Sequence, residues 1–109
     1  MSKYKLVRDF IPEIIKNEGK NPDYCVASED EYLSYLSAKL EEETHELVHA
    51  LLMGSRQDVE NEMADVYEVL VTIMANKGTR HPVDLAREKR CGYGGFDKKL
   101  LLKVDKPSN

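Results

Sequence analysis

Two acidic clusters carry the side chains of this chain that are best suited to chemistry. The first holds Glu42, Glu43 and Glu46 in the run LEEETHEL, and the second holds Glu62 and Asp65 in NEMADVYEV. Carboxylate oxygens are the ligands that Mg²⁺ prefers, and Mg²⁺ usually retains water or phosphate oxygens as well. Grouped carboxylates without a cation repel one another and resist ionisation. The clusters therefore predict a magnesium site able to act on phosphate, with a solvated acidic helix face as the alternative.

Both clusters lie on long predicted helices that are joined by a Met-Gly-Ser turn. The first helix is expected at about residues 29–52, after Ser28, which begins a capping box. The second is expected to open at Ser55 or Asp58 and to run to about Asn76. A turn this short makes the two helices antiparallel neighbours.

Positions around each helix place four of the carboxylates beside apolar stripes. Glu43 and Glu46 lie about 60° and 120° from the leucine stripe of the first helix, at 100° per residue. Glu62 and Asp65 lie about 40° and 100° from the apolar stripe of the second helix, in the same rotational sense. Antiparallel helices packed stripe to stripe bring these sides to one shared edge. The four carboxylates are therefore expected to converge there.

Length, composition and charge set limits on the kind of protein. The 109 residues fit one domain, 1–109, and a charged fraction of 33% favours a helical protein. A net charge of −4 argues against a broad nucleic-acid-binding face. No apolar run has the length of a membrane span and no signal peptide is evident, so a cytoplasmic protein with no membrane partner is expected. Cys25 and Cys91 are accordingly expected to be free thiols.

Shorter elements flank the predicted hairpin. A short helix capped by Asp9 would pack the isoleucines of residues 11–15 on the hairpin, and Arg8 beside it is a functional candidate or a local ion-pair partner. A second short helix is expected at residues 83–90 and is closed by Gly92. The fold class is therefore all-α, with an antiparallel hairpin core in an oligomeric bundle, and residues 105–109 are expected to be frayed. A minor β element is the remaining expectation, from residues 5–7, 24–27 and 100–104.

A glycine-rich segment near the C-terminus lies between cations. Residues 92–96 read GYGGF, with Lys89 and Arg90 before them and Lys98 and Lys99 after them. Glycines let backbone N–H groups approach an anion closely. The segment is a candidate phosphate-binding loop, and a plain turn is the alternative.

A competing zinc motif overlaps the first acidic cluster. His45 to His49 reads HELVH, which matches the H-E-x-x-H pattern of zinc hydrolases. On the helix, however, His45 and His49 lie about 140° and 180° from the leucine stripe, facing away from the second helix. A surface position or a subunit contact is the expected role of both histidines.

These motifs together resemble a known group of proteins. Residues 39–46 and 62–65 resemble the paired K-L-x-E-E-x-x-E and E-x-x-D motifs of the all-α nucleoside triphosphate pyrophosphohydrolases, the MazG-like and phosphoribosyl-ATP pyrophosphohydrolase-like proteins. Residues 4–15 and 94–96 resemble a small single-domain branch of that group. The resemblance covers most of the chain.

The resemblance implies Mg²⁺-dependent cleavage between the α- and β-phosphates of a nucleotide, with Mn²⁺ as a substitute ion. The products would be a nucleoside monophosphate and pyrophosphate. The implied metal ligands are Glu43, Glu46, Glu62 and Asp65. Glu42 would orient or deprotonate water, and Lys39 would meet phosphate. The group often has a basic residue before Gly-Gly-Phe, where this chain has Tyr93, and Arg90 is the expected substitute. From the chemistry of the reaction, Lys89, Lys98 or Lys99 is expected to receive charge on the leaving pyrophosphate.

Two further expectations concern partners and the alternative function. The resemblance implies a homodimer or homotetramer, and a substrate that is either a non-standard nucleotide or similar to phosphoribosyl-ATP. A non-catalytic helical oligomer that binds nucleotides is the alternative function. Product formation from a panel of nucleotides with Mg²⁺ distinguishes the two.

Overall fold

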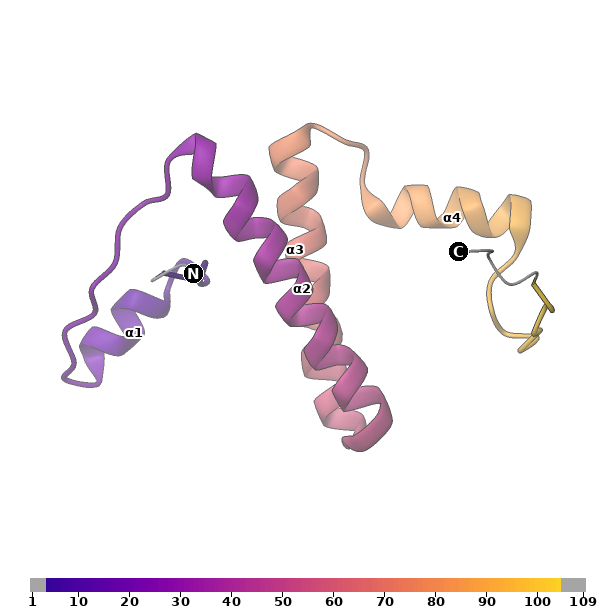
Figure 1. Cartoon of the computed structure of the whole chain (residues 1–109), viewed down its shortest axis with the longest axis horizontal. Helices are drawn as coiled ribbons and strands as arrows, with labels where there is room; N and C mark the ends of the chain where they lie inside the picture. The colour runs from indigo at the N-terminus through magenta and orange to yellow at the C-terminus, as the bar shows by residue number, and fades with distance from the viewer. Residues whose placement is uncertain (1–3, 105–109) are drawn as a thin grey trace.

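The described part of the chain, residues 4–104 of the computed structural model, forms four helices and no strand (Figure 1). They are α1 (Ile11–Asn17), α2 (Glu29–Met53), α3 (Arg56–Lys77) and α4 (Pro82–Tyr93). The all-α fold with a hairpin core is thereby confirmed, whereas the predicted minor β element was wrong for these residues. The predictions for residues 105–109 lie outside the described range.

The two long helices pack together as an antiparallel hairpin, and the short helices lie on either side of it. Helix α4 contacts α3, but α1 has no close backbone contact with another helix. In Figure 1, α1 lies on one side of the hairpin, and α4 with the segment after it lies on the other. None of the described helices combines the length and the apolarity needed to cross a bilayer.

Reciprocal capping boxes begin both long helices. The Oγ of Ser28 accepts a hydrogen bond from the backbone N–H of Glu31 at 3.2 Å, and the Glu31 carboxylate accepts one from the N–H of Ser28. Ser55 and Asp58 make the same exchange at 3.1 and 3.0 Å. Each box satisfies two backbone donors that the start of a helix would leave unpaired. Ser55, one of the two predicted starts, is the N-cap of α3.

The ends of the short helices differ from the prediction. Helix α1 follows Phe10 rather than Asp9, and Phe10 makes no side-chain cap. Helix α4 continues through Gly92 and ends at Gly94, whose φ is 84°. A glycine inside a helix weakens it by about 1 kcal/mol without stopping it, whereas a positive φ does stop it. Gly94 therefore closes α4, and the predicted stop at Gly92 was wrong.

The core of one copy is small. Among the described residues the buried apolar side chains are Leu36 and Ala50 of α2 and Val69 of α3. The accessible area is 9988 Å², whereas a folded monomer of this mass exposes about 6,200 Å². One copy on its own therefore leaves extensive apolar surface uncovered. Cys25 and Cys91 are free thiols, as predicted, and both are exposed.

Candidate functional site

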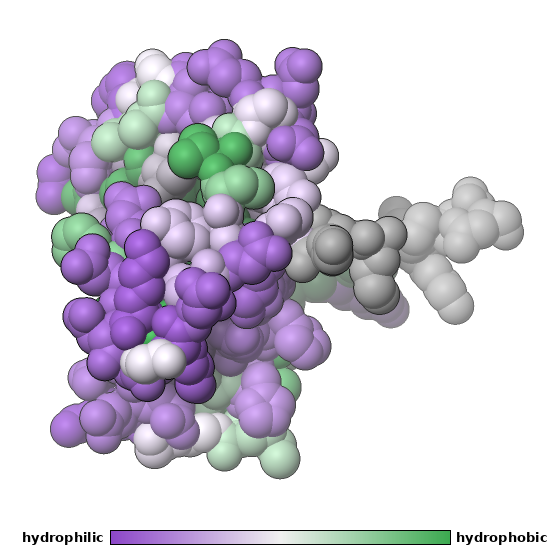
Figure 2. Space-filling view, turned by 90° about the vertical axis from the view of Figure 1, so that its left-hand side faces the viewer, coloured by the Kyte–Doolittle hydropathy of each residue, from purple (hydrophilic) through white to green (hydrophobic). Residues whose placement is uncertain are grey.

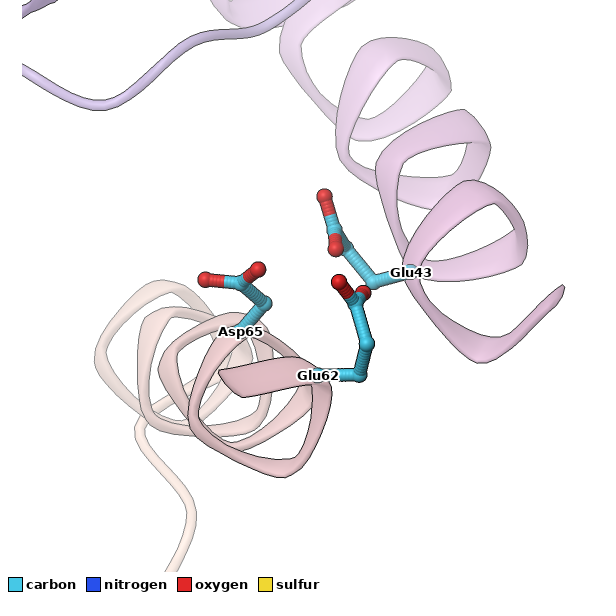
Figure 3. A group of neighbouring side chains, drawn as sticks. All are labelled: Glu43, Glu62 and Asp65. Atoms are coloured by element: carbon cyan, nitrogen blue, oxygen red, sulfur yellow. The ribbon is translucent and has the colours of Figure 1, made fainter. Parts of the chain in front are cut away.

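Three carboxylates from the hairpin helices meet at one edge between α2 and α3. Glu43 comes from α2, and Glu62 and Asp65 come from α3 and point toward the same region (Figure 3). One carboxylate oxygen from each of the three lies within 4.8 Å of the other two. The structure thus brings together three of the four side chains that the helix geometry placed at this edge. Glu46, the fourth, is exposed and lies outside the group.

Burial makes these carboxylates unlike an ordinary acidic surface. Glu43 is only 5% exposed. The Oε2 atoms of Glu43 and Glu62 are both buried and have no hydrogen-bond partner among the described residues. A buried oxygen without a partner costs a few kcal/mol, about 1–3 by mutational measures and more when the group is charged. The hairpin therefore holds acceptor oxygens that a cation would satisfy.

Lys39 neutralises part of the charge from within α2. Its Nζ donates to Glu42 at 2.9 Å and lies 3.1 Å from Glu43. Burial by itself would lower the pKa of Lys39, but the hydrogen bonds to Glu42 and Glu43 outweigh it and the pKa is raised. The hydrogen bond from Lys39 is also the main reason why the pKa of Glu42 is lowered. Lys39 thus remains charged and Glu42 ionised, so Glu42 is a weak base.

The segment before α1 adds two cations that sequence reasoning did not place here. The guanidinium of Arg8 donates to Asp65 at 2.7 Å, and Lys5 lies 3.8 Å from Glu42. Arg8 therefore does not form the local ion pair that was one of its two predicted roles. It instead contacts Asp65, which lies on α3. No periodic pattern in the sequence marks this contact, because an extended segment packing on a distant helix leaves no regular spacing.

The three cations, together with Glu43 and Asp65, line a cleft of about 860 Å³ between residues 5–14 and the hairpin, whereas Glu42 and Glu62 are not part of its lining. Its lining contains charged, apolar and aromatic side chains, which come from the N-terminal segment and from both long helices. They include Arg8, Lys39, Glu43, Asp65, Phe10 and Tyr32. Figure 2 shows that the face on the α1 side is largely hydrophilic, with hydrophobic areas within it. A cleft of this size and mixed character suits a small ligand with a charged end and an apolar end.

The other predicted substrate contacts lie elsewhere. Lys89, Arg90 and Lys98 do not line the cleft. They belong to α4 and the segment after it, on the far side of the hairpin from α1 (Figure 1). Arg90 instead pairs with Asp97 at 2.7 Å. Within one chain the structure does not bring these cations to the carboxylates.

The two histidines of the HELVH run also lie outside the group. His45 and His49 are exposed on α2, and among the described residues the group close enough to share an ion consists of the three carboxylates. The outward orientation expected from the helix angles is confirmed.

The carboxylate group fits a hard divalent cation. Oxygens in an octahedron around Mg²⁺, at 2.0–2.1 Å from the ion, lie about 3 to 4 Å from one another. Oxygens that already lie within 4.8 Å reach such spacings by small side-chain rotations. Three hard oxygen donors, two of them with buried and unpartnered atoms, match Mg²⁺ or Mn²⁺ better than a softer metal.

Fold and site together define an all-helical protein with a carboxylate group in a cleft beside a helical hairpin. Residues 7–87 match the family model of phosphoribosyl-ATP pyrophosphohydrolase, and the chain belongs to this family. Membership confirms the resemblance seen in the motifs. The matched region contains the carboxylates, the hairpin and Arg8.

One relative matches part of the chain. An uncharacterized protein of Mycolicibacterium smegmatis is 51% identical over 43 residues. The similarity spans 39% of this chain and 44% of that protein's length. No solved structure matches the chain.

Proposed function

We propose that the protein is a Mg²⁺-dependent nucleoside triphosphate pyrophosphohydrolase that cleaves the bond between the α- and β-phosphates. The observation that carries the proposal is the group of Glu43, Glu62 and Asp65, with its buried unpartnered oxygens, opening on a cleft lined by cations. Family membership supports the same class of reaction. The substrate is a non-standard nucleotide or one similar to phosphoribosyl-ATP.

The metal would be held by Glu43, Glu62 and Asp65, and Glu46, which is one turn further along α2, would be a fourth ligand. When bound, Mg²⁺ supplies charge neutralisation of the phosphates and makes the attacking water more acidic. Mn²⁺ offers the same chemistry with the same oxygen donors.

The chain's own residues position the water and the phosphates. Glu42 accepts a hydrogen bond from the water and orients it, since the lowered pKa of Glu42 makes it a weak base. The water oxygen bonds to the α-phosphorus as the bond to the bridging oxygen breaks, and pyrophosphate leaves. The proton released by the water passes to solvent. Lys39 and Arg8, both in the cleft, balance charge on the phosphate oxygens.

A homodimer or homotetramer is the assembly we propose, because one copy buries few apolar side chains. In such an assembly Lys89, Arg90 and Lys98 reach the leaving pyrophosphate from a neighbouring copy. The apolar part of the cleft, with Phe10 and Tyr32, receives the nucleoside.

The test is a panel of canonical and damaged nucleoside triphosphates, together with phosphoribosyl-ATP, incubated with Mg²⁺ and analysed for monophosphate and pyrophosphate. Asp65→Asn should abolish release and Glu46→Gln should reduce it, and both variants should keep the helical circular dichroism intact. Glu41→Gln is the matched control, because Glu41 is an exposed neighbour on α2 outside the cleft. Undiminished release from Asp65→Asn would rule out the carboxylate site.

The panel also tests the non-catalytic alternative. The ion pairs of Lys39 and Arg8 with the carboxylates show that the cleft balances its charge partly without metal. If no triphosphate is hydrolysed but several raise the melting temperature, the protein is a nucleotide-binding module.

A further inference from the structure

The last described residues form an exposed apolar and basic segment that the proposed reaction does not account for within one chain. We call residues 94–104 the C-terminal arm. It lies beyond residues 7–87, which the family model matches. Phe96 and Leu101 are 97% and 98% exposed, and the other large apolar side chains of the arm are also exposed. These are Leu100, Leu102 and Val104.

Contacts with α4 fix the start of the arm. Arg90 pairs with Asp97 at 2.7 Å, and its guanidinium lies against Gly95, where a Cβ would come within 2.3 Å of Nη1. The N–H of Lys99 donates to the carbonyl of Phe96 at 3.2 Å, and Lys99 has a left-handed φ of 57°. The arm therefore leaves α4 through a defined turn at residues 95–99.

Charge distinguishes the arm from the hairpin. Residues 87–104 hold six basic and two acidic side chains, whereas residues 29–77 hold twelve acidic and three basic ones. The hairpin also exposes large apolar side chains, among them Leu33, Leu51 and Met63. A basic apolar arm and an acidic apolar hairpin are complementary in both respects.

We infer that the C-terminal arm docks on the α2–α3 hairpin of a second copy of this chain. Its own hairpin is not the occupant, because the arm follows α4 and lies away from the hairpin, on the opposite side from α1 (Figure 1). The accessible area exceeds that of an ordinary monomer of this mass by about 3,800 Å², well above the roughly 800 Å² per partner that a standard interface buries. An exchange of arms between two copies would cover part of this surface.

The consequence for the site rests on the proposed function. A docked arm carries Lys98 and Lys99 to the acidic hairpin of the partner copy, where cations are needed once a triphosphate is bound. The docking itself does not depend on catalysis, so it is tested by structural readouts.

The experiment is carbodiimide cross-linking of the full chain in a mixture of unlabelled and ¹⁵N-labelled copies that were unfolded and refolded together. The reagent joins a lysine to a carboxylate that it contacts. We expect peptides with Lys98 or Lys99 joined to acidic residues of α2 or α3, with half of these products carrying one labelled and one unlabelled partner. Cross-links confined to same-label pairs, or no cross-links from the arm, would overturn the inference.

A charge-reversal pair gives the second measurement. Lys98→Glu with Lys99→Glu should weaken self-association in sedimentation by about tenfold or more, and leave helicity unchanged. Lys16→Glu with Lys20→Glu is the matched control, because it makes the same charge change on exposed lysines at and after α1. Equal effects of the two double variants on self-association would contradict the inference. So would a wild-type protein that does not self-associate but sediments with anionic vesicles.

Discussion

The guanidinium of Arg8 lies 2.7 Å from the carboxylate of Asp65, although the two residues are 57 positions apart in the chain. Asp65 is also one of the three carboxylates close enough to share an ion. A metal bound to this group would therefore compete with Arg8 for Asp65. The guanidinium displaced from Asp65 would still lie in the cleft, where it could pair with phosphate.

Arg8→Gln should consequently shift metal binding and nucleotide binding in opposite directions. Removing the competitor should tighten Mn²⁺ binding about threefold, whereas losing one charge-assisted contact should weaken binding of a non-hydrolysable triphosphate about tenfold. Calorimetric titration with each ligand measures both effects. Arg56→Gln, which changes an exposed arginine at the start of α3, should alter neither. A loss of both affinities would instead mean that Arg8 holds the cleft together.

Mg²⁺ should stabilise the folded protein because it satisfies the buried oxygens of Glu43 and Glu62. At a free Mg²⁺ concentration of 100 times its Kd, the free energy of unfolding should rise by about 2.7 kcal/mol. Thermal unfolding with Mg²⁺ and with excess chelator measures the difference. KCl at equal ionic strength is the control for screening, and Glu62→Gln should reduce the response to Mg²⁺ to a small fraction of this value.

Glu46 and Glu62 should differ in their contribution to metal affinity. Glu62 is already positioned with a buried oxygen, whereas Glu46 is exposed and must rotate toward the ion. We expect Glu62→Gln to weaken Mn²⁺ binding about a hundredfold and Glu46→Gln about tenfold. The contribution of Glu46 is smaller because part of its binding free energy is offset by the entropy cost of ordering an exposed side chain. Electron paramagnetic resonance of free Mn²⁺ measures both. Wild-type affinity in Glu46→Gln would remove Glu46 from the ligand set.

The hairpin turn should depend on the Ser55 capping box. Ser55→Ala removes the acceptor of the Asp58 N–H and should lower the free energy of unfolding by about 0.5–2 kcal/mol. Urea denaturation measures the change. Ser37→Ala is the control, since Ser37 is exposed within α2, where alanine is the better helix former. A larger loss from Ser37→Ala would contradict the capping account.

Much of the fold could be predicted because its signals are local. The serines that begin α2 and α3 each form a box with a carboxylate three residues later, and Gly78 ends α3 with a φ of 67°. Such signals depend on backbone donors and side chains within one turn, so they are readable without knowledge of the rest of the chain. The start of α1 and the end of α4 could not be predicted from local signals. Asp9 is compatible with an N-cap and also with the turn before one, and Gly92 is compatible with a helix end and also with the interior of a helix.

The sequence by itself determined the helical hairpin and the edge at which Glu43, Glu62 and Asp65 meet, because helix periodicity and a short turn fix the direction in which each side chain points. Only the tertiary structure decided that residues 5–14 form the second wall of the cleft and that Arg8 pairs with Asp65. It also decided that Lys89, Arg90 and Lys98 lie away from the cleft of their own chain. These relationships depend on how extended segments pack against distant helices, and no repeating spacing in the sequence records that packing.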